Sequence, residues 1–277
     1  MLEGLYYEIS VAAARQQGFV TRAQATRLGA DDAALDRLKE FKLLVEIDDG
    51  VFQLASGTVA PRYAYPFAAW LALDAARFRW ERPQTPGDDA VLSHESAAKL
   101  HGVGRIAVPR TVFTVAVERA TPRATVLHLG RLPAQDVTVV EGVPVTTVHR
   151  TIVDLVRDGN DHEDVGRALA DAVRKDLVDL GAVYEAMAPL GAEYGYPVAG
   201  ERFVGYFLAD ADPSSLSARN LRAYARLADP ASVADVQRRV EDLLTALPAA
   251  AGAPGGRPGA VRGDEIAAEI VGRLRWG

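Results

Sequence analysis

The side chains best suited to chemistry near the start of the chain are cations, and they fall within residues 19–54. Arginine and lysine contact phosphate oxygens, and arginine also recognises guanine in the DNA major groove. We expect Arg37 and Lys39 to read bases or contact phosphates, and their neighbours to touch the adjacent backbone. The full candidate DNA-binding set is Thr21, Arg22, Arg27, Arg37, Lys39 and Lys42.

Two helix patterns must position these side chains. Thr21 with Gln24 three positions later is a capping-box pattern that starts one helix, and Gly29 marks the end of that helix. A second helix is expected over residues 32–41, with Asp31 or Asp32 as its cap. An amphipathic pattern over residues 5–17 predicts a further helix before them.

Two short apolar runs follow, separated by Asp48, Asp49 and Gly50. An Asp-Gly turn between apolar runs predicts a β-hairpin. Helix, turn, helix and hairpin in this order predict a winged helix-turn-helix domain over residues 1–58. In such a domain the second helix of the motif, residues 32–41, enters the major groove.

The charge balance opposes this interpretation. The 277-residue chain has a net charge of −6, and residues 1–60 hold six Lys/Arg against nine Asp/Glu, a net charge of −3. DNA binding depends largely on phosphate neutralisation, so a basic surface is the usual signature. Weak DNA binding, binding only as a dimer, and a protein-docking role are all compatible with this composition.

The sequence lacks the patterns of several function classes. There is no cysteine, which excludes thiol catalysis, disulfides and thiolate metal sites. We find no P-loop, no GxSxG motif and no nucleotidyltransferase motif, so we expect no catalytic residues, no cofactor and no enzymatic activity. No apolar run approaches the roughly 20 residues that span a bilayer, and the first residues do not resemble a signal peptide. We therefore expect a cytoplasmic protein without a membrane partner.

Two histidines, His94 and His101, lie seven residues apart in the stretch VLSHESAAKLHGVG. On a helix they would face the same side about two turns apart, which suits a ligand or partner site. No third ligand stands at metal-binding spacing, so we expect hydrogen-bonded structural histidines and no metal.

The fold class expected for the whole chain is α+β. Strand-like runs between residues 111 and 146 predict a small, mostly antiparallel sheet covered by helices, with a hairpin turn at Glu141 and Gly142. A helix over residues 66–78 precedes them. Helical patterns dominate the rest of the chain. The expected segments are 1–58, an α+β domain over 64–190, a helical extension over 191–247, a linker over 248–262 and an amphipathic helix over 263–277.

The helical extension carries a second group of cations. Arg219, Arg222 and Arg226 follow one another at spacings of three and four, which places them along one helix face. The stripe is either a secondary phosphate-contacting surface or a solvated face. The helix over 263–277 is too short to be stable alone, so we expect it to dock on the body, on a second subunit or on a partner.

Three stretches resemble the AbiEi family of antitoxins from type IV toxin–antitoxin systems. They are GFVTRAQATRLGADDAALDRLKEFKLLVEIDDGVFQL, VLSHESAAKLHGVG and VEGVPVTTVHRTIVDL, and the resemblance covers about residues 5–190. It implies a winged-helix DNA-binding domain and an antitoxin that represses its own operon. The implied partners are double-stranded promoter DNA with inverted repeats, bound as a homodimer or as two monomers, and a nucleotidyltransferase-like toxin that the antitoxin need not touch.

Two other interpretations follow from the same residues. In the first, the acidic N-terminal domain has lost DNA binding and serves as a protein-interaction module. Proteins with a similar middle segment also carry a C-terminal nuclease domain, which needs clustered carboxylates and a lysine. Residues 191–277 contain no lysine, so a nuclease is not expected.

Overall fold

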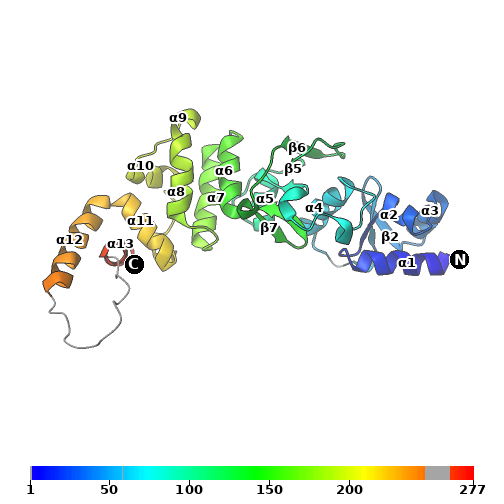
Figure 1. Cartoon of the computed structure of the whole chain (residues 1–277), viewed down its shortest axis with the longest axis horizontal. Helices are drawn as coiled ribbons and strands as arrows, with labels where there is room; N and C mark the ends of the chain where they lie inside the picture. The colour runs from blue at the N-terminus through cyan, green and yellow to red at the C-terminus, as the bar shows by residue number, and fades with distance from the viewer. Residues whose placement is uncertain (1, 58, 247–262) are drawn as a thin grey trace, which may run out of the picture. The chain divides into compact units, whose positions relative to one another are not determined.

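The computed structural model describes residues 2–57, 59–246 and 263–277 (Figure 1). The chain divides into two compact units. Unit 1 comprises residues 1–102 and 106–151, and unit 2 comprises residues 103–105 and 152–277. Helices and two β-sheets make it a mixed α/β structure, which confirms the expected fold class at that level.

The first part of unit 1 contains a three-stranded antiparallel sheet in the order β1-β3-β2. The hairpin expected at Asp48–Gly50 is present, but the first strand of the sheet was not expected because it is only three residues long. The elements are α1 (Leu2–Ala14), β1 (Phe19–Thr21), α2 (Arg22–Arg27), α3 (Asp32–Glu40), β2 (Leu44–Asp48) and β3 (Val51–Leu54).

Local sequence signals account for these elements. Thr21 and Gln24 form the expected capping box at the start of α2. The Asp31 carboxylate accepts a hydrogen bond from the Ala34 N–H at 2.8 Å and caps α3. A small core lies between the helices and the sheet, and its fully buried members include Ile9, Leu38 and Phe52.

The second part of unit 1 is built on a five-stranded sheet in the order β6-β5-β4-β8-β7. The expectation of a mostly antiparallel sheet is wrong here. The β4–β5 and β7–β8 pairs are antiparallel, whereas β4–β8 and β5–β6 are parallel. Alternating apolar residues reveal a strand but carry no information on its direction. The strands are β4 (Val91–Leu92), β5 (Thr111–Val115), β6 (Thr125–Leu129), β7 (Val137–Val140) and β8 (Val143–Thr146).

The hairpin between β7 and β8 turns at Glu141 and Gly142, as expected. Both residues have a positive φ, 47° and 79°, as a two-residue type I′ turn requires. Two helices pack beside the sheet, α4 (Pro61–Ala72) and α5 (His94–His101). The expected helix over 66–78 is misplaced, because α4 begins five residues earlier, contains Pro66 in its interior and ends at Ala72.

Unit 2 consists of helices. Their packing buries Leu169, Val183 and Phe203 completely. Helix α6 spans the division between the units. The helices are α6 (Val148–Arg157), α7 (His162–Arg174), α8 (Leu180–Met187), α9 (Gly191–Tyr194), α10 (Gly200–Phe207), α11 (Ala218–Ala228), α12 (Pro230–Ala246) and α13 (Gly263–Trp276).

The last helix, α13, docks on the body of unit 2, one of the three expected possibilities. Ala267, Ala268 and Val271 are buried in a cluster with Ala225 of α11 and Val233 of α12. A Cβ atom at Gly272 would lie 2.8 Å from the Leu221 side chain, so only glycine permits this close approach to α11.

The expected linker over 248–262 lies outside the described residues, and the other expected domain boundaries stay predictions. Among the helices that the structure describes, none has both the length and the apolar character needed to cross a bilayer.

Candidate functional site

Helix α3 is anchored by one face and exposes the other. Leu35 and Leu38 are buried in the core, whereas Arg37 projects to the surface. The side chain of Arg37 makes no hydrogen bond or ion pair with the residues that the structure describes. Its five guanidinium donors are therefore available to an external acceptor.

Lys42 is the second available cation. It follows the end of α3, is exposed, has a positive φ of 55° and makes no ion pair with any described residue. The neighbouring Phe41 leaves 65% of its surface exposed. Arg37, Phe41 and Lys42 thus form an accessible patch at the end of α3, which we call the α3 patch.

Two other candidate DNA contacts, the expected reader Lys39 and the expected backbone contact Arg22, are paired with carboxylates. Lys39 Nζ lies 2.9 Å from the Asp36 carboxylate and 3.5 Å from that of Glu46. The hydrogen bond to Asp36 raises the pKa of Lys39, and the same contact lowers the pKa of Asp36. Arg22 pairs with Asp32. Each must exchange a carboxylate for a phosphate before it can contact DNA.

Thr21 and Arg27 have structural roles. Thr21 is 1% exposed, caps α2 and donates a hydrogen bond to the Ala75 carbonyl. Arg27 makes two hydrogen bonds to Glu81, at 2.7 and 2.8 Å, and its guanidinium lies 4.7 Å from the centre of the Phe78 ring. The hydrogen bonds from Arg27 are the main reason why the pKa of Glu81 is lowered to about 2.

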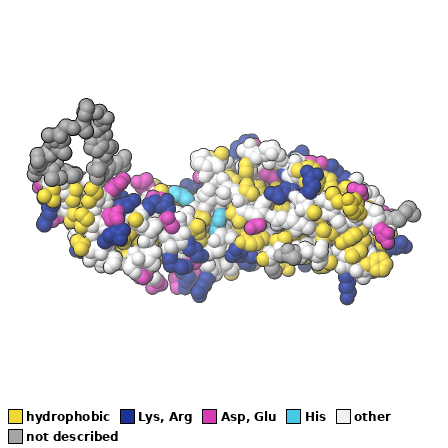
Figure 2. Space-filling view, turned by 90° about the horizontal axis from the view of Figure 1, so that it is seen from below, with side chains coloured by type: hydrophobic (Ala, Val, Ile, Leu, Met, Phe, Trp, Pro, Cys, Tyr) yellow, Lys and Arg dark blue, Asp and Glu magenta, His cyan; other side chains and the backbone are white. Residues whose placement is uncertain are grey.

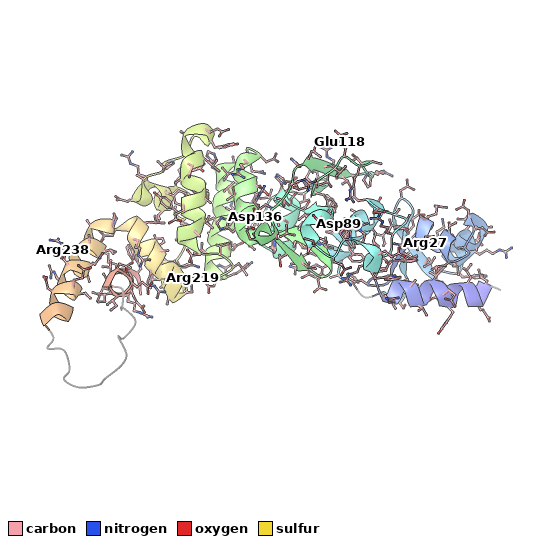
Figure 3. The ribbon with its side chains drawn as sticks, viewed as in Figure 1. Arg27, Asp89, Glu118, Asp136, Arg219 and Arg238 are labelled. Atoms are coloured by element: carbon pink, nitrogen blue, oxygen red, sulfur yellow. The ribbon has the colours of Figure 1, made fainter. Side chains whose placement is uncertain are left out.

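The stripe on α11 is neutralised in the same way. Arg219 lies 2.7 Å from the Asp176 carboxylate, Arg222 lies 3.2 Å from Glu269, and Arg226 lies 3.2 Å from Asp264. The last two carboxylates belong to α13, so these arginines, although partly exposed, already have carboxylate partners within unit 2. Figure 2 shows positive and negative side chains intermixed over these helices, and Figure 3 marks Arg219 on α11.

The two histidines of α5 are hydrogen-bonded, as expected. His101 Nε2 lies 2.7 Å from the Thr146 carbonyl oxygen, and burial lowers the pKa of its ring. His94 Nδ1 lies 2.9 Å from Ser93 Oγ, and its ring stacks on His128 with 4.2 Å between centroids. Ser93 does not cap α5 with its side chain. Its hydroxyl instead accepts a hydrogen bond from Thr114 in β5 at 2.9 Å.

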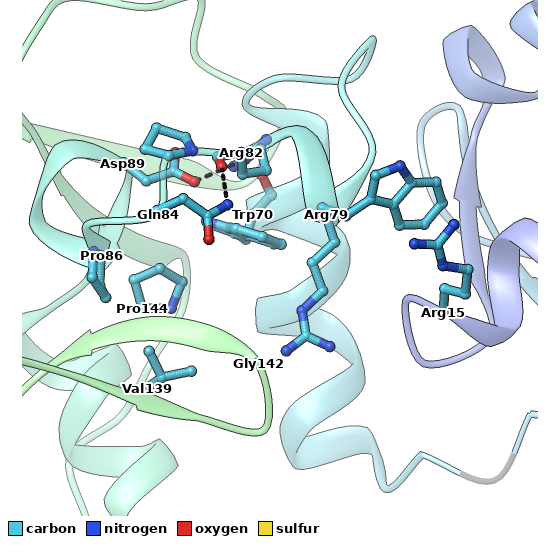
Figure 4. A pocket seen from close by; sticks show the side chains of 12 residues that line it. Arg15, Trp70, Arg79, Arg82, Gln84, Pro86, Asp89, Val139, Gly142 and Pro144 are labelled. Carbon is cyan, nitrogen blue, oxygen red and sulfur yellow. Dashed lines mark hydrogen bonds and ion pairs between the residues drawn. The ribbon is translucent and has the colours of Figure 1, made fainter.

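A buried ion pair between Arg82 and Asp89 was not predicted from the sequence. Arg82 Nε lies 2.8 Å from Asp89, and both side chains are 2% exposed. Arg82 also donates to the Trp70 carbonyl at 2.9 Å and lies over the Trp70 ring (Figure 4). Burial lowers its pKa. Nothing in the residue pattern distinguishes this pair from surface charges seven positions apart.

Arg82 and Asp89 form part of the wall of a pocket of about 460 Å³. Arg79 extends toward Gly142 of the hairpin, and Arg15 lies 3.9 Å from the centre of the Trp80 ring (Figure 4). Because Phe78 stacks on the Trp80 ring at a centroid distance of 4.6 Å, that ring already has aromatic and cationic neighbours. These contacts link the end of α1 to the segment that follows α4, and they already occupy the Trp80 ring that a ligand would stack on.

A scan against protein-family models found no matching family, and a search of curated proteins found no match.

Proposed function

We propose that this protein is a DNA-binding transcriptional autorepressor and the antitoxin of an AbiE-like type IV toxin–antitoxin system. The observation that carries the DNA-binding part is the arrangement of the first 54 residues. Two helices joined by a tight turn precede a hairpin, and the short strand β1, between α1 and α2, pairs with β3 as the third strand of the sheet. A winged helix has this order of elements, so α3 is the element we assign to the major groove.

The exposed face of α3 supports this assignment. Arg37 lies on that face without an internal partner and can donate two parallel hydrogen bonds to a guanine. Lys42, just beyond the helix, suits a phosphate. The proposal therefore narrows the expected contacts to Arg37 and Lys42, with Lys39 and Arg22 as secondary contacts released from their carboxylates.

The salt dependence follows from this small number of free cations. Each phosphate neutralised contributes about −0.9 to the slope of log K against log salt concentration. One or two phosphate contacts per domain predict a slope of about −1 to −2 for one protein molecule, and about twice that for two molecules on inverted repeats. A much steeper slope would require cations that the α3 patch does not supply.

The experiment is fluorescence anisotropy with a labelled duplex from the region upstream of the gene, with a scrambled duplex as competitor. Arg37→Ala should weaken specific binding about tenfold or more, because a bidentate guanine contact is lost. Lys42→Ala should weaken binding to all sequences and lower the salt slope by about 1. The matched control is Arg238→Ala on α12, a 74% exposed arginine outside the first domain. Equal affinity of the wild type and Arg37→Ala would refute the role of α3.

The antitoxin part rests on the three family-like sequence stretches. It is tested by expressing the neighbouring reading frame, if that frame encodes a nucleotidyltransferase-like protein, with and without this chain. Growth arrest by the neighbour alone, relieved by co-expression, is the expected result. Relief that persists in Arg37→Ala would separate neutralisation from repression, because it would not need DNA binding. The proposal includes a cytoplasmic location and no enzymatic activity of its own.

A second candidate is a protein-docking module that does not bind DNA. The ion pairs Arg22–Asp32 and Lys39–Asp36 favour it, because they leave few cations free on an acidic domain. The exposed Phe41 beside Arg37 would then be the centre of a protein interface. Absence of promoter binding at low salt, together with capture of the neighbouring gene product by the wild type and not by Phe41→Ala, would establish this alternative.

A further inference from the structure

A second pocket of unit 1 lies away from the α3 patch. It has a volume of about 470 Å³ and is formed by α4, α5 and the segment that leads into β5. Much of its wall is apolar, including Pro66 of α4, Leu100 of α5 and Val108. Tyr65, which is 59% exposed, adds an aromatic ring at its edge. An apolar pocket with a few polar groups is typical of small-molecule sites.

Every charged side chain that lines this pocket is a cation. Arg62 comes from α4, Lys99 from α5, and Arg110 from the segment before β5. None of the three forms an ion pair with a carboxylate among the described residues, in contrast to Lys39, Arg27 and the arginines of α11. Three cations that line one pocket without a carboxylate counter-ion repel one another, and an anion bound among them would offset that repulsion.

The scaffold around these cations is ordered by hydrogen bonds. The hydroxyl of Ser96, one turn before Lys99, accepts a hydrogen bond from the Val112 N–H at 2.9 Å and donates one to the Arg110 carbonyl at 3.4 Å. These bonds fix α5 against the segment that carries Arg110. Arg62 lies 4.6 Å from the centre of the Tyr63 ring and donates to its hydroxyl. Lys99 and Arg110 therefore project from two segments that are hydrogen-bonded to each other.

We propose that this pocket binds a small organic phosphate whose body is apolar or aromatic. Arginine forks and a lysine ammonium suit a phosphate dianion, and three positive charges exceed what a single carboxylate would compensate. The apolar wall and Tyr65 would cover the body of the ligand. The proposal gives a role to Ser96, Lys99 and Leu100 of the stretch VLSHESAAKLHGVG, and it does not depend on DNA binding.

The test is isothermal titration of the full chain with phenyl phosphate, which combines both features of the proposed ligand. Inorganic phosphate supplies the charge alone, and benzyl alcohol supplies the aromatic body alone. We expect one site for phenyl phosphate, with about tenfold weaker binding of inorganic phosphate because the phenyl ring buries apolar surface. Benzyl alcohol should not bind measurably.

Lys99→Ala and Arg110→Ala should each weaken phenyl phosphate about tenfold, because each removes a charge-assisted hydrogen bond. Both side chains are exposed, so these variants should fold normally. Arg131→Ala is the matched control, since Arg131 is an exposed arginine of unit 1 that does not line the pocket.

Three outcomes would overturn the proposal. They are no saturable binding of phenyl phosphate, equal affinity for inorganic phosphate, and equal weakening by Arg131→Ala, which would mean general attraction of anions to the surface. Phenyl phosphate binding to this pocket and promoter binding through α3 are measured in separate experiments. Either proposal can therefore be refuted while the other holds.

Discussion

Replacing Asp89 by asparagine should destabilise unit 1 strongly while hardly changing its shape. Asparagine has nearly the same volume and can keep the hydrogen bond that Asp89 Oδ1 accepts from the Ala90 N–H at 2.7 Å. It removes the negative charge opposite Arg82, whose side chain is only 2% exposed. An uncompensated buried charge is the main penalty when a buried ion pair is broken.

The structure sets the expected magnitude. Breaking a buried pair typically costs about 3–5 kcal/mol. Arg82 keeps its bonds to the carbonyl oxygens of Trp70 and Asp74, at 2.9 and 3.3 Å, and its contact with the Trp70 ring. Arg119, the second partner of Asp89, is 23% exposed and can turn to solvent. We therefore expect a loss of about 3 kcal/mol, at the lower end of this range.

The assay is urea unfolding followed by tryptophan fluorescence, since Trp70 contacts Arg82 directly. A double variant, Arg82→Met with Asp89→Asn, removes both charges and should lose less than the sum of the two single variants by about 2 kcal/mol. Asp235→Asn is the control, because its partners Arg238 and Arg239 are largely exposed, and it should cause no measurable change. A loss below about 1 kcal/mol for Asp89→Asn, or strict additivity in the double variant, would refute the reasoning.

Two further predictions concern the contacts of Glu81 and Asn220. The folded pKa of Glu81 is about 2, below its ordinary value of 4.5, so its pair with Arg27 stabilises the protein above pH 4.5 and that contribution is lost as the pH falls toward 2. Glu81→Gln should therefore flatten the pH dependence of stability in this window, as measured by thermal unfolding at several pH values, and an unchanged profile would contradict it. Asn220 is fully buried, accepts from the Leu180 N–H at 2.9 Å and donates to the Val178 carbonyl at 3.0 Å. Asn220→Ala should cost about 3 kcal/mol in denaturant unfolding because it leaves buried backbone groups without partners, and a loss like that of an exposed asparagine would show that water replaces the side chain.

Much of the secondary structure follows from local sequence signals. The capping box at Thr21, the Asp-Gly hairpin at Gly50 and the turn at Gly142 each act within a few residues, so the sequence alone is sufficient to locate them. Strand direction in the five-stranded sheet depends on which segments meet in space, and alternation is the same in both directions. Strand β4 has only two residues, which is too short for an alternating pattern, so the sequence did not predict it.

The candidate site was less predictable than the fold, because the availability of a charge depends on its neighbours. Arg27 and Arg37 are equivalent in the sequence, yet one is bound to Glu81, 54 residues away, and the other is exposed without a partner. The same applies to Arg222 and Arg226 of α11, whose carboxylate partners, Glu269 and Asp264, lie far along the chain on α13. Spacing along one helix cannot reveal such pairs.

The docking of α13 has a consequence for how the protein is made. Ala225 of α11 and Val233 of α12 complete their apolar cluster only with residues from α13. During synthesis, these two helices are therefore ready before the surface that covers them exists. Until Val271 has left the ribosome, the apolar surface around Ala225 and Val233 faces solvent and is open to chaperones or to another nascent chain.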